Sequence, residues 1–362
     1  MKSLRLCICV VTLFLAFNVS AQYKIDVLDS NTFHLAEGVI LSKTSFRGLS
    51  VVDDQTIWIS GSRGTIAKSI DGGKSFSFQQ LKGYEKSDFR DIEAFDDKRA
   101  IIMSSGTPAY ILKTNDGGQT WKEVYKNTDT AYFLDAMDFW NDKKGMLVGD
   151  PINEHFLLMQ TNDGGETWQQ LDTNKTPTAF PGEAVFAASG TSLRCWGRND
   201  FGFVTGGKET RFIHSKRNSK SFKTITLNVK HGRQSQGTFS FTKSKYYLMF
   251  VGGDYTHDTS TEFINFEYLF KKHIESNQSI YENSHGYKSS VEVIQDENKY
   301  GDPIIIATGT GGTEYGLLAC TFISGEYRFA KIGLGFNVVR KAKKGKAVFL
   351  AGDKGKIGKL IF

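Results

Sequence analysis

The chain has 362 residues, of which 40% are hydrophobic, 23% charged and 13% aromatic. This composition excludes a disordered chain, a collagen-like rod and a small disulfide-stabilised scaffold. The formal net charge of +6 is spread along the sequence without a run of five like charges, whereas a nucleic-acid-binding protein usually concentrates its basic residues in a stripe. We therefore expect no nucleic-acid partner.

Residues 1–21 have the features of a signal peptide. Lys2 and Arg5 form a basic start, residues 6–17 are almost continuously apolar, and residues 19–21 give the small-x-small pattern that precedes cleavage. The apolar run is too short for a membrane-spanning helix, which needs roughly 20 residues. We therefore expect cleavage after Ala21, no membrane span in the mature chain, and a periplasmic or secreted protein.

Two of the four cysteines, Cys7 and Cys9, lie in this signal, so the mature chain keeps Cys195 and Cys320. These two could form a disulfide in an oxidising compartment, but a sequence does not determine cysteine pairing. We favour two buried free thiols.

One octapeptide, with the pattern S/T-x-D-G-G-x-S/T-F/W, recurs at 69–76, 114–121 and 161–168. Its aspartates are Asp71, Asp116 and Asp163, so successive copies are 116 − 71 = 45 and 163 − 116 = 47 residues apart. A degenerate fourth copy at 215–222 has Arg217 in place of the aspartate. Self-similarity at such a period indicates a chain built from repeated structural units.

Each unit begins with an aromatic residue that opens a short strand: Phe46, Phe89, Phe133, Phe180, Phe239, Tyr287 and Phe336. A second apolar strand follows and ends near glycine, at 58–61, 101–106, 146–149, 203–207, 248–253, 304–309 and 348–352. A third strand leads into the octapeptide and a fourth leaves it. Seven such units predict an all-β, seven-bladed β-propeller over residues 22–362, with a stacked solenoid as the main alternative.

The two ends of the chain favour a closed ring. The last unit stops at Phe362, about one strand short, and a spare strand precedes the first unit, either at 23–28 or at 32–35. If that N-terminal strand completed the last blade, both open sheet edges would be paired. The segment 262–281 departs from the blade pattern, and it is either a decorated third and fourth strand or an inserted amphipathic helix.

We expect a structural role for the octapeptides. In a hairpin turn the aspartates Asp71, Asp116 and Asp163 can accept hydrogen bonds from nearby N–H groups, and glycines permit the left-handed backbone that such turns need. The aromatic residue packs back on the blade. A calcium site would need more oxygen ligands than one aspartate and two glycines supply. The structural set is Asp71, Asp116, Asp163, Gly72, Gly117, Gly164, Trp121 and Trp168.

Function is expected at the other end of the blades, which receives the start of each first strand and the end of each second strand. We call this end the axial face. The residues predicted to bind a ligand there are Arg47, Arg63, Arg90, Asp150, Lys208, His257, Lys288 and Tyr315, and the loop residue Asp353 falls at an equivalent position. The candidates for catalysis are Glu183, Asp91, Asp135, Asp254 and Tyr255.

Two kinds of glycoside hydrolase are compatible with these residue types. A general glycosidase needs two carboxyl groups across a pocket, such as Glu183 and one of the aspartates. A sialidase would hold the sugar carboxylate with an arginine triad, for which Arg47, Arg63 and Arg90 are candidates. The Arg-Ile-Pro motif of sialidases is missing, however, and residues 46–49 (FRGL) replace it only loosely.

Cofactor chemistry has no motif in this sequence. The glycine-rich stretch 309–312 is not followed by a helical pattern, so it is no dinucleotide fingerprint. The histidines and cysteines lack metal-ligand spacing. We therefore predict neither cofactor nor metal.

The octapeptide resembles the Asp-box, or BNR, repeat of sialidase-like and sortilin-like propellers. Residues 64–76 (GTIAKSIDGGKSF) are similar to the photosystem II assembly and stability factor family. Residues 89–95 (FRDIEAF), 133–140 (FLDAMDFW), 182–193 (GEAVFAASGTSL) and 252–255 (GGDY) resemble a group of exported bacterial Asp-box propellers. The resemblance covers most of residues 40–362, and it implies a propeller whose arginine-bearing face could hold a client protein.

The leading interpretation is a non-catalytic binding or assembly propeller that presents a mixed-charge axial face to a protein or glycan partner. We expect a monomer without a cofactor. The alternative is a glycoside hydrolase, sialidase-like or other, that uses carboxylates at the axial mouth.

Overall fold

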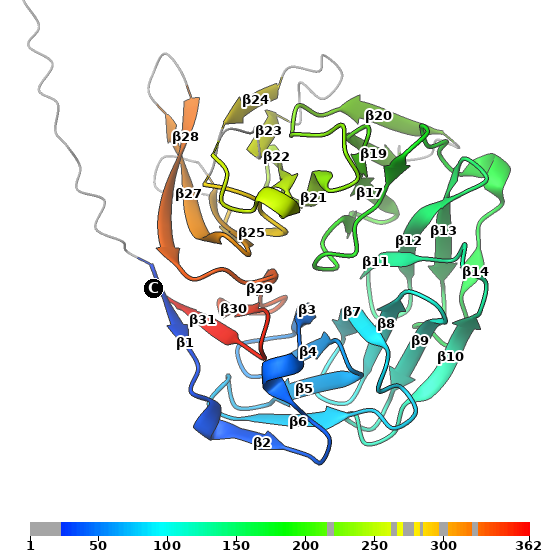
Figure 1. Cartoon of the computed structure of the whole chain (residues 1–362), viewed down its shortest axis with the longest axis vertical. Coiled ribbons are helices and arrows are strands. Elements are labelled where there is room, and N and C mark those ends of the chain that lie inside the picture. Colours follow the sequence, from blue (N-terminus) through cyan, green and yellow to red (C-terminus); the bar gives the residue numbers. More distant parts are fainter. Residues whose placement is uncertain are drawn as a thin grey trace, which may run out of the picture.

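The computed structural model describes residues 23–215, 221–261, 266–270, 279–282, 285–296, 303–320 and 325–362. Seven antiparallel β-sheets are arranged as blades around a central axis, which confirms the predicted seven-bladed propeller (Figure 1). The predicted signal peptide, residues 1–21, lies outside the described residues.

In each blade the strands follow one another in chain order from the axis outward, and β1 is the outermost strand of blade seven. Blades one to three contain β3 (Phe46–Val51), β4 (Ile57–Gly61), β5 (Thr65–Ser69) and β6 (Phe76–Gln80); β7 (Asp88–Ala94), β8 (Ala100–Ser105), β9 (Ala109–Thr114) and β10 (Lys122–Asn127); and β11 (Leu134–Phe139), β12 (Gly145–Ile152), β13 (His155–Thr161) and β14 (Gln169–Gln170). Blades four and five contain β16 (Leu193–Trp196), β17 (Asp200–Val204), β19 (Arg211–Ser215) and β20 (Phe222–Thr226); and β21 (Gln236–Lys243), β22 (Tyr247–Asp254), β23 (Phe266–Phe270) and β24 (Ser279–Glu282). Blades six and seven contain β25 (Ser290–Gln295), β26 (Ile304–Gly309), β27 (Gly312–Cys320) and β28 (Gly325–Gly333); and β29 (Val338–Lys341), β30 (Val348–Ala351), β31 (Ile357–Ile361) and β1 (Lys24–Val27).

The N-terminal strand closes the ring, as predicted. Strand β1 pairs antiparallel with β31, from Lys24 opposite Ile361 to Val27 opposite Gly358, so the segment 23–28 completes blade seven. The other candidate also forms a strand, β2 (Phe33–Leu35), which lies parallel to β6 as a fifth strand of blade one. The start of the chain therefore covers the outer edges of two neighbouring blades.

Blade four differs from the predicted pattern. Its innermost strand is β16, which begins at Leu193, whereas the sequence pattern placed the opening aromatic at Phe180. Residues 180–192, here called the axial connector, instead cross the axial face, where β15 (Glu183–Ala184) pairs with β18 (Gly206–Gly207). Phe180 is 53% exposed, so it is not a blade-core residue.

The segment 262–281 forms strands where it is described. Strands β23 and β24 pair with each other and continue the blade-five sheet from β22. Of the two alternatives left open by the sequence, the extra blade strands are therefore right and the amphipathic helix is wrong for these residues. Residues 262–265 and 271–278 lie outside the described part of the chain.

Apolar side chains fill the space between neighbouring blades. One cluster joins blades seven and one through Val338, Phe349, Phe46 and Phe76, all fully buried. Burial of one such side chain contributes about 1.5–3 kcal/mol, so these layers hold the blades in place around the axis. The innermost strands surround the axis, where one cavity lies at each end. This axial space is here called the channel.

The three Asp-boxes form the turns β5–β6, β9–β10 and β13–β14. In the first, Asp71 accepts hydrogen bonds from the Ser69 hydroxyl at 2.8 Å, the Ser75 N–H at 3.0 Å and the Ser75 hydroxyl at 2.6 Å. Asp116 and Asp163 make the same contacts with threonines. These hydrogen bonds lower the pKa of all three carboxyls to about 2.

The glycines and aromatic residues of these turns follow the same plan. Gly72, Gly117 and Gly164 have φ between 71° and 81°, which a side chain would strain. Trp121 packs edge-on against Trp58 of blade one, with ring centres 6.3 Å apart, and Trp168 packs against Phe139 at 5.9 Å. Of the degenerate fourth copy, residues 216–220 lie outside the described residues.

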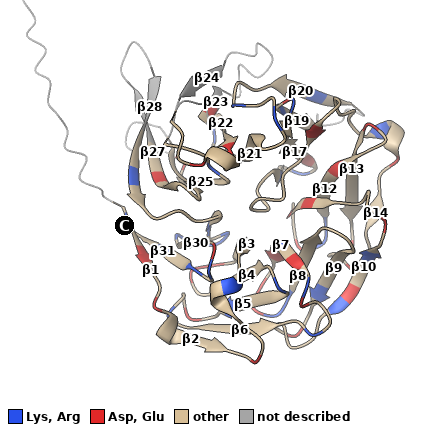
Figure 2. Ribbon diagram, viewed as in Figure 1, with Lys and Arg blue, Asp and Glu red and all other residues tan. Residues whose placement is uncertain are grey.

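The helices in the described residues are four single 3₁₀ turns: η1 (Ser30–Thr32), η2 (Leu41–Lys43), η3 (Thr173–Lys175) and η4 (Tyr255–His257). None of them has the length or the apolar character to cross a membrane. Figure 2 shows that charges of both signs are distributed around the ring.

Candidate functional site

A cavity of about 500 Å³ opens at the axial face. Five of the predicted site residues line it together: Arg47, Arg90, Asp135, Asp150 and Tyr255. They meet because the first strands begin and the second strands end at this end of the axis. The backbone of the axial connector forms a further wall, which the strand pattern did not predict.

The axial connector enters the channel and is fixed there. The Ser189 hydroxyl donates a hydrogen bond to the Ser289 carbonyl of blade six at 2.7 Å, and the Thr191 hydroxyl donates to Ser240 of blade five at 2.6 Å. Gly190, with φ of 65°, lies so close to Asp91 of blade two that a Cβ would fall 2.2 Å from its carboxylate. In Figure 1 this green segment reaches into the middle of the ring.

Two arginines from adjacent blades point into this cavity. Arg47 donates from Nη1 to the Ala188 carbonyl and Arg90 from Nη1 to the Ala187 carbonyl, both at 3.4 Å. Arg90 also forms an ion pair with Asp88 at 2.8 Å, in which the side chains are 31% and 26% exposed. A guanidinium has five N–H donors, so both arginines keep donors for a ligand.

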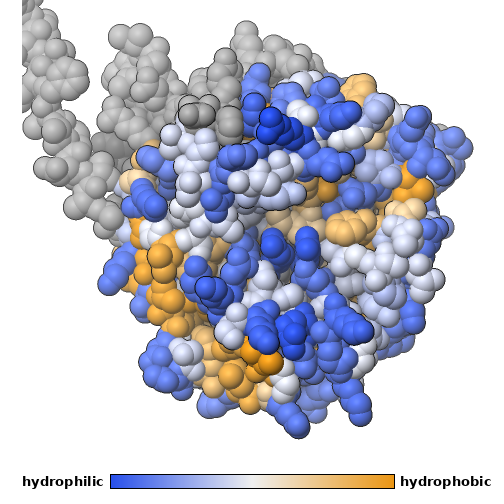
Figure 3. All heavy atoms as spheres, in the orientation of Figure 1, coloured by the Kyte–Doolittle hydropathy of each residue, from blue (hydrophilic) through white to orange (hydrophobic). Residues whose placement is uncertain are grey.

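Aromatic rings form an apolar wall in the same cavity. Phe186 of the connector stacks on Phe239 with ring centres 3.9 Å apart and an interplanar angle of 6°. Tyr287 meets Phe239 edge-on at 4.8 Å, and Tyr255 does so at 6.1 Å. Tyr255 is 49% exposed, so this wall is open to a ligand. Figure 3 shows a mainly hydrophilic face with apolar areas near its middle and at the lower left, over β1 and β31.

Two carboxyl groups complete the cavity. Asp135 is fully buried, and burial followed by the nearby charge of Asp150 raises its pKa well above the usual value. Asp150 accepts a hydrogen bond from the Val185 N–H at 3.1 Å, and burial raises its pKa to about 6. Both acids therefore lie where a negative charge is poorly compensated.

A second pocket, of about 520 Å³, adjoins the axial cavity and shares Asp150 and Ala184 with it. Glu183 lies at its wall, with both oxygens bonded. Oε1 accepts from Arg211 Nε at 2.7 Å and Thr205 at 2.6 Å, and Oε2 accepts from Arg211 Nη2 at 2.5 Å and the Phe180 N–H at 2.9 Å. Four donors saturate a carboxylate, so Glu183 anchors the connector to blade four.

Two other catalytic candidates are bonded within the scaffold. Asp91 is 1% exposed and accepts from the N–H groups of Ile92 at 2.8 Å and Met137 at 2.7 Å, which links blades two and three. Asp254 caps η4 by accepting from Thr256 and also accepts from Gln236, and these hydrogen bonds keep its pKa below the usual value.

The remaining predicted ligand residues do not line the axial cavity. Lys288 is fully buried and donates to the His285 carbonyl at 2.6 Å, and Tyr315 is 2% exposed in the core between blades six and seven. Both differ from the expectation because their side chains turn into the sheets. Three others also lie outside the cavity lining: Arg63 and Lys208 in loops, and His257 in η4. Asp353 is held by Ser45 at 2.5 Å and Asn337 at 2.9 Å.

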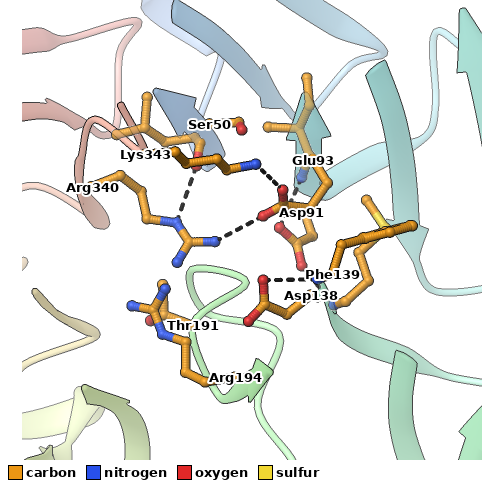
Figure 4. Close-up of polar contacts among 12 residues, drawn as sticks. Ser50, Asp91, Glu93, Asp138, Phe139, Thr191, Arg194, Arg340 and Lys343 are labelled. Atoms are coloured by element: carbon orange, nitrogen blue, oxygen red, sulfur yellow. Dashed lines mark hydrogen bonds and ion pairs between the residues drawn. The ribbon is translucent and has the colours of Figure 1, made fainter. Parts of the chain in front are cut away.

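The other end of the channel, on the Asp-box face, holds an ion network that the sequence reasoning missed (Figure 4). It lines a cavity of about 370 Å³. Glu93 pairs with Arg340 at 3.3 Å and with Lys343, while Glu292 pairs with Arg194 at 3.0 Å. These pairs join innermost strands of blades two, four, six and seven across the axis. We call this set the lower ring.

Asp138 also belongs to the lower ring. It accepts from the Phe139 N–H at 2.9 Å and the Cys195 N–H at 2.6 Å. Burial, and then the charge of Glu93, raises its pKa to about 6. Cys195 is a free thiol whose pKa is raised by burial; the side chain of Cys320 lies outside the described residues. Aligning the repeats on their bulges would have revealed this ring, because Ser50, Glu93 and Asp138 occupy one register of β3, β7 and β11.

No group of three or more His, Cys, Asp or Glu side chains that could hold a metal ion occurs in the described ranges. This finding agrees with the residue types at both ends of the channel, where carboxylates meet arginines and backbone N–H groups.

Comparison with known proteins supports the repeat assignment. A family model of the photosynthesis system II assembly factor YCF48 matches residues 90–192. A structure of YCF48 bound to D1 peptide is 11% identical, with 94% of this chain and 95% of that chain covered and a TM-score of 0.61. The structure of YCF48 from Cyanidioschyzon merolae is 14% identical to this chain, with 93% of this chain and 98% of that chain covered and a TM-score of 0.55. No significant match is found among curated protein sequences.

The fold is shared more widely. The structure of U3-55K covers 93% of this chain and 98% of its own at 11% identity, with a TM-score of 0.62. Structural similarity at such identity establishes the propeller alone. Together with the family model, it shows that the chain is an Asp-box repeat propeller similar to the photosystem II assembly factor family.

Proposed function

We propose that this propeller is a non-catalytic binding or assembly protein whose axial face receives an extended segment of a partner protein. One observation carries the proposal: Arg47, Arg90 and an aromatic wall line a single preformed cavity of about 500 Å³. Guanidinium groups donate hydrogen bonds to peptide carbonyls and carboxylates, and exposed aromatic rings bind apolar side chains. Ligand cavities in proteins typically measure about 300–1,000 Å³.

The similar proteins support a protein partner over a glycan. The matched family region, 90–192, includes Arg90, Asp135, Asp150 and the axial connector, and a YCF48 structure of the same fold has a D1 peptide bound. The adjoining pocket continues the axial cavity along the connector, from the end of β12 in blade three toward β18, which gives an extended chain room to continue. We also propose, from residues 1–21, that the partner is met in the periplasm or outside the cell.

The hydrolase alternative has less support. It depended on Glu183 with one of the aspartates, and the Glu183 carboxylate is saturated by Arg211, Thr205 and the Phe180 N–H. A general acid needs a carboxyl that reaches the glycosidic oxygen. Glu183 would have to break an ion pair that is 9% exposed on the arginine side and buried on the other.

The test is selection of binders from a displayed library of random dodecapeptides against the purified protein. We expect binders whose affinity falls at least tenfold in the double variant Arg47→Ala/Arg90→Ala. The matched control is Arg99→Ala, which removes an arginine paired with Asp96 and Asp142 on the Asp-box face and should leave binding unchanged. Equal losses in both variants, or no binders, would refute the proposal, and turnover of a fluorogenic glycoside would favour the hydrolase.

A further inference from the structure

We infer that Asp135 and Asp150 form an acidic subsite of the axial cavity that takes the lysine or arginine side chain of the partner segment. This inference rests on the proposed function and specifies its chemistry. Arg47 and Arg90 would bind the backbone or carboxylates of the segment, while the acidic subsite would select a basic residue within it.

The first observation is an unsatisfied carboxyl. Asp135 lines the cavity, is 0% exposed, and has no hydrogen-bond partner for either oxygen among the described residues. The N–H groups of Ala187 and Asp150 favour its charged form, but neither reaches hydrogen-bond geometry. Buried polar atoms in native proteins nearly always have a partner, and leaving one unpaired costs about 1–3 kcal/mol. A positively charged ligand group held nearby by Asp150 would offset part of that cost through its field.

The second observation is the neighbouring acid. Asp150 is only partly buried and accepts one described hydrogen bond, from Val185, whereas a carboxylate accepts about four. The two acids interact electrostatically, and each makes the negative charge of the other less favourable. An ammonium or guanidinium group in the cavity beside Asp150 would stabilise the charged forms of both carboxyls. Asp150 would make the direct contact, and Asp135 would add to the local field.

The protein's own cations do not already fill this role. In the described part of the chain, no lysine, arginine or histidine lies within the 4.0 Å ion-pair distance of Asp135 or Asp150, and the ion-pair partner of Arg90 is Asp88. Arg90 acts on Asp135 only through the longer-range field. These carboxyls therefore have no cation of the protein beside them, and a basic group of a ligand could pair with Asp150.

A basic side chain fits the cavity better than a metal ion. Two carboxylates supply fewer ligands than Ca²⁺ or Mg²⁺ require, and no His, Cys, Asp or Glu of the described residues joins them in a group of three. The aromatic wall of Tyr255, Tyr287 and Phe239 instead suits the apolar stem of lysine or arginine and the cation–π contact of its head.

The experiment uses the dodecapeptide binders selected by the wild-type protein. We expect lysine or arginine to be enriched at one position. Synthetic peptides with norleucine in place of that residue should bind the wild-type protein at least tenfold more weakly. Asp150→Asn should remove this preference, so that both peptides bind with the affinity of the norleucine peptide, and Asp135→Asn should reduce it partly. Arg47→Ala should weaken both peptides by the same factor.

Two outcomes separate this inference from the proposed function. If binders depend on Arg47 and Arg90 but tolerate norleucine, or if Asp150→Asn weakens both peptides equally, the acidic subsite is refuted and the binding function stands. If no binder depends on the arginines, both are refuted. Thermal unfolding of Asp150→Asn and Asp135→Asn checks that each variant is folded before binding is measured.

Discussion

The Glu93 carboxylate of the lower ring is the most informative position for a stability test. Glu93 is 1% exposed and holds Arg340, which is 7% exposed, at 3.3 Å. Its other partner, Lys343, has a side chain that is 42% exposed. Glu93→Gln keeps the shape of the side chain but removes its charge. Among the described residues, the carboxylate left to pair with Arg340 would then be Glu292, at 4.0 Å, and its hydrogen bond to the Leu49 carbonyl at 3.3 Å would stay.

The expected loss follows from the burial of each partner. Breaking a buried ion pair by removing one partner costs about 3–5 kcal/mol because the remaining charge is uncompensated. The Lys343 contact adds little, since exposed pairs are worth about 0–1 kcal/mol. A compensating gain arises at Asp91 and Asp138, whose ionisation the charge of Glu93 opposes. We therefore expect Glu93→Gln to lower the free energy of unfolding by about 3 kcal/mol, the low end of that range.

Urea denaturation of four proteins measures this directly: wild type, Glu93→Gln, Arg340→Met and the double variant. The midpoint should fall in each single variant without a change in the m-value. The double variant should be less destabilised than the sum of the two, because it leaves no buried charge unpaired. Lys343→Met is the matched control and should cost at most about 1 kcal/mol. A loss below 1 kcal/mol in Glu93→Gln, or additive effects in the double variant, would contradict the reasoning.

Three further predictions concern other parts of the ring. The pKa values of Asp138 and Asp150 are raised from 3.8 to about 6, so between these values the folded protein holds protons that the unfolded chain has lost. Its free energy of unfolding should therefore fall as pH rises from about 4 to about 6. Urea titrations at each pH measure this slope, and Asp150→Asn should flatten it. A slope that Asp150→Asn leaves unchanged would argue against this assignment. Thr161→Val removes the hydroxyl that binds Asp163 at 2.8 Å and the buried Gly165 N–H at 2.8 Å, and it should cost about 1–3 kcal/mol by thermal unfolding, more than Thr167→Val at the exposed side of the same turn. Deletion of residues 23–28 should expose the edge of β31, and aggregation on heating should begin at a lower temperature than in wild type; unchanged light scattering would show that closure by β1 is dispensable.

The repeat carried most of the fold information. The octapeptide and the glycine-ended second strands are local signals, because turn chemistry and period-2 patterning depend on a few adjacent residues. The missing last strand predicted closure by β1. Phe180 was misplaced because it has the expected spacing, but the strand that follows it, β15, pairs with β18 and is not the first strand of blade four.

The candidate site was less predictable for the same reason. Arg47, Arg90 and Asp135 follow from their position at the starts of first strands, where topology alone brings them to one end of the axis. Tyr315 was misjudged because it lies within β27, opposite Ile306, and not in the loop after the second strand, so its side chain belongs to the core. Alignment of the repeats places Glu93 and Asp138 in one register. Their partners across the axis are far apart in the sequence, such as Lys343, 250 residues from Glu93, and this pairing has no local signature.

The two ends of the channel differ in how their charges are balanced, and this difference separates stability from binding. In the lower ring, Glu93 and Glu292 each have an arginine partner within 3.3 Å, so the network joins four blades and leaves little for a ligand. In the axial cavity, Arg47 contacts only a carbonyl among its described partners, and Asp135 has unbonded oxygens. Uncompensated groups destabilise a fold unless a ligand pairs with them. The axial cavity is therefore the end where binding would lower the free energy most, and the rigid lower ring keeps its walls in position.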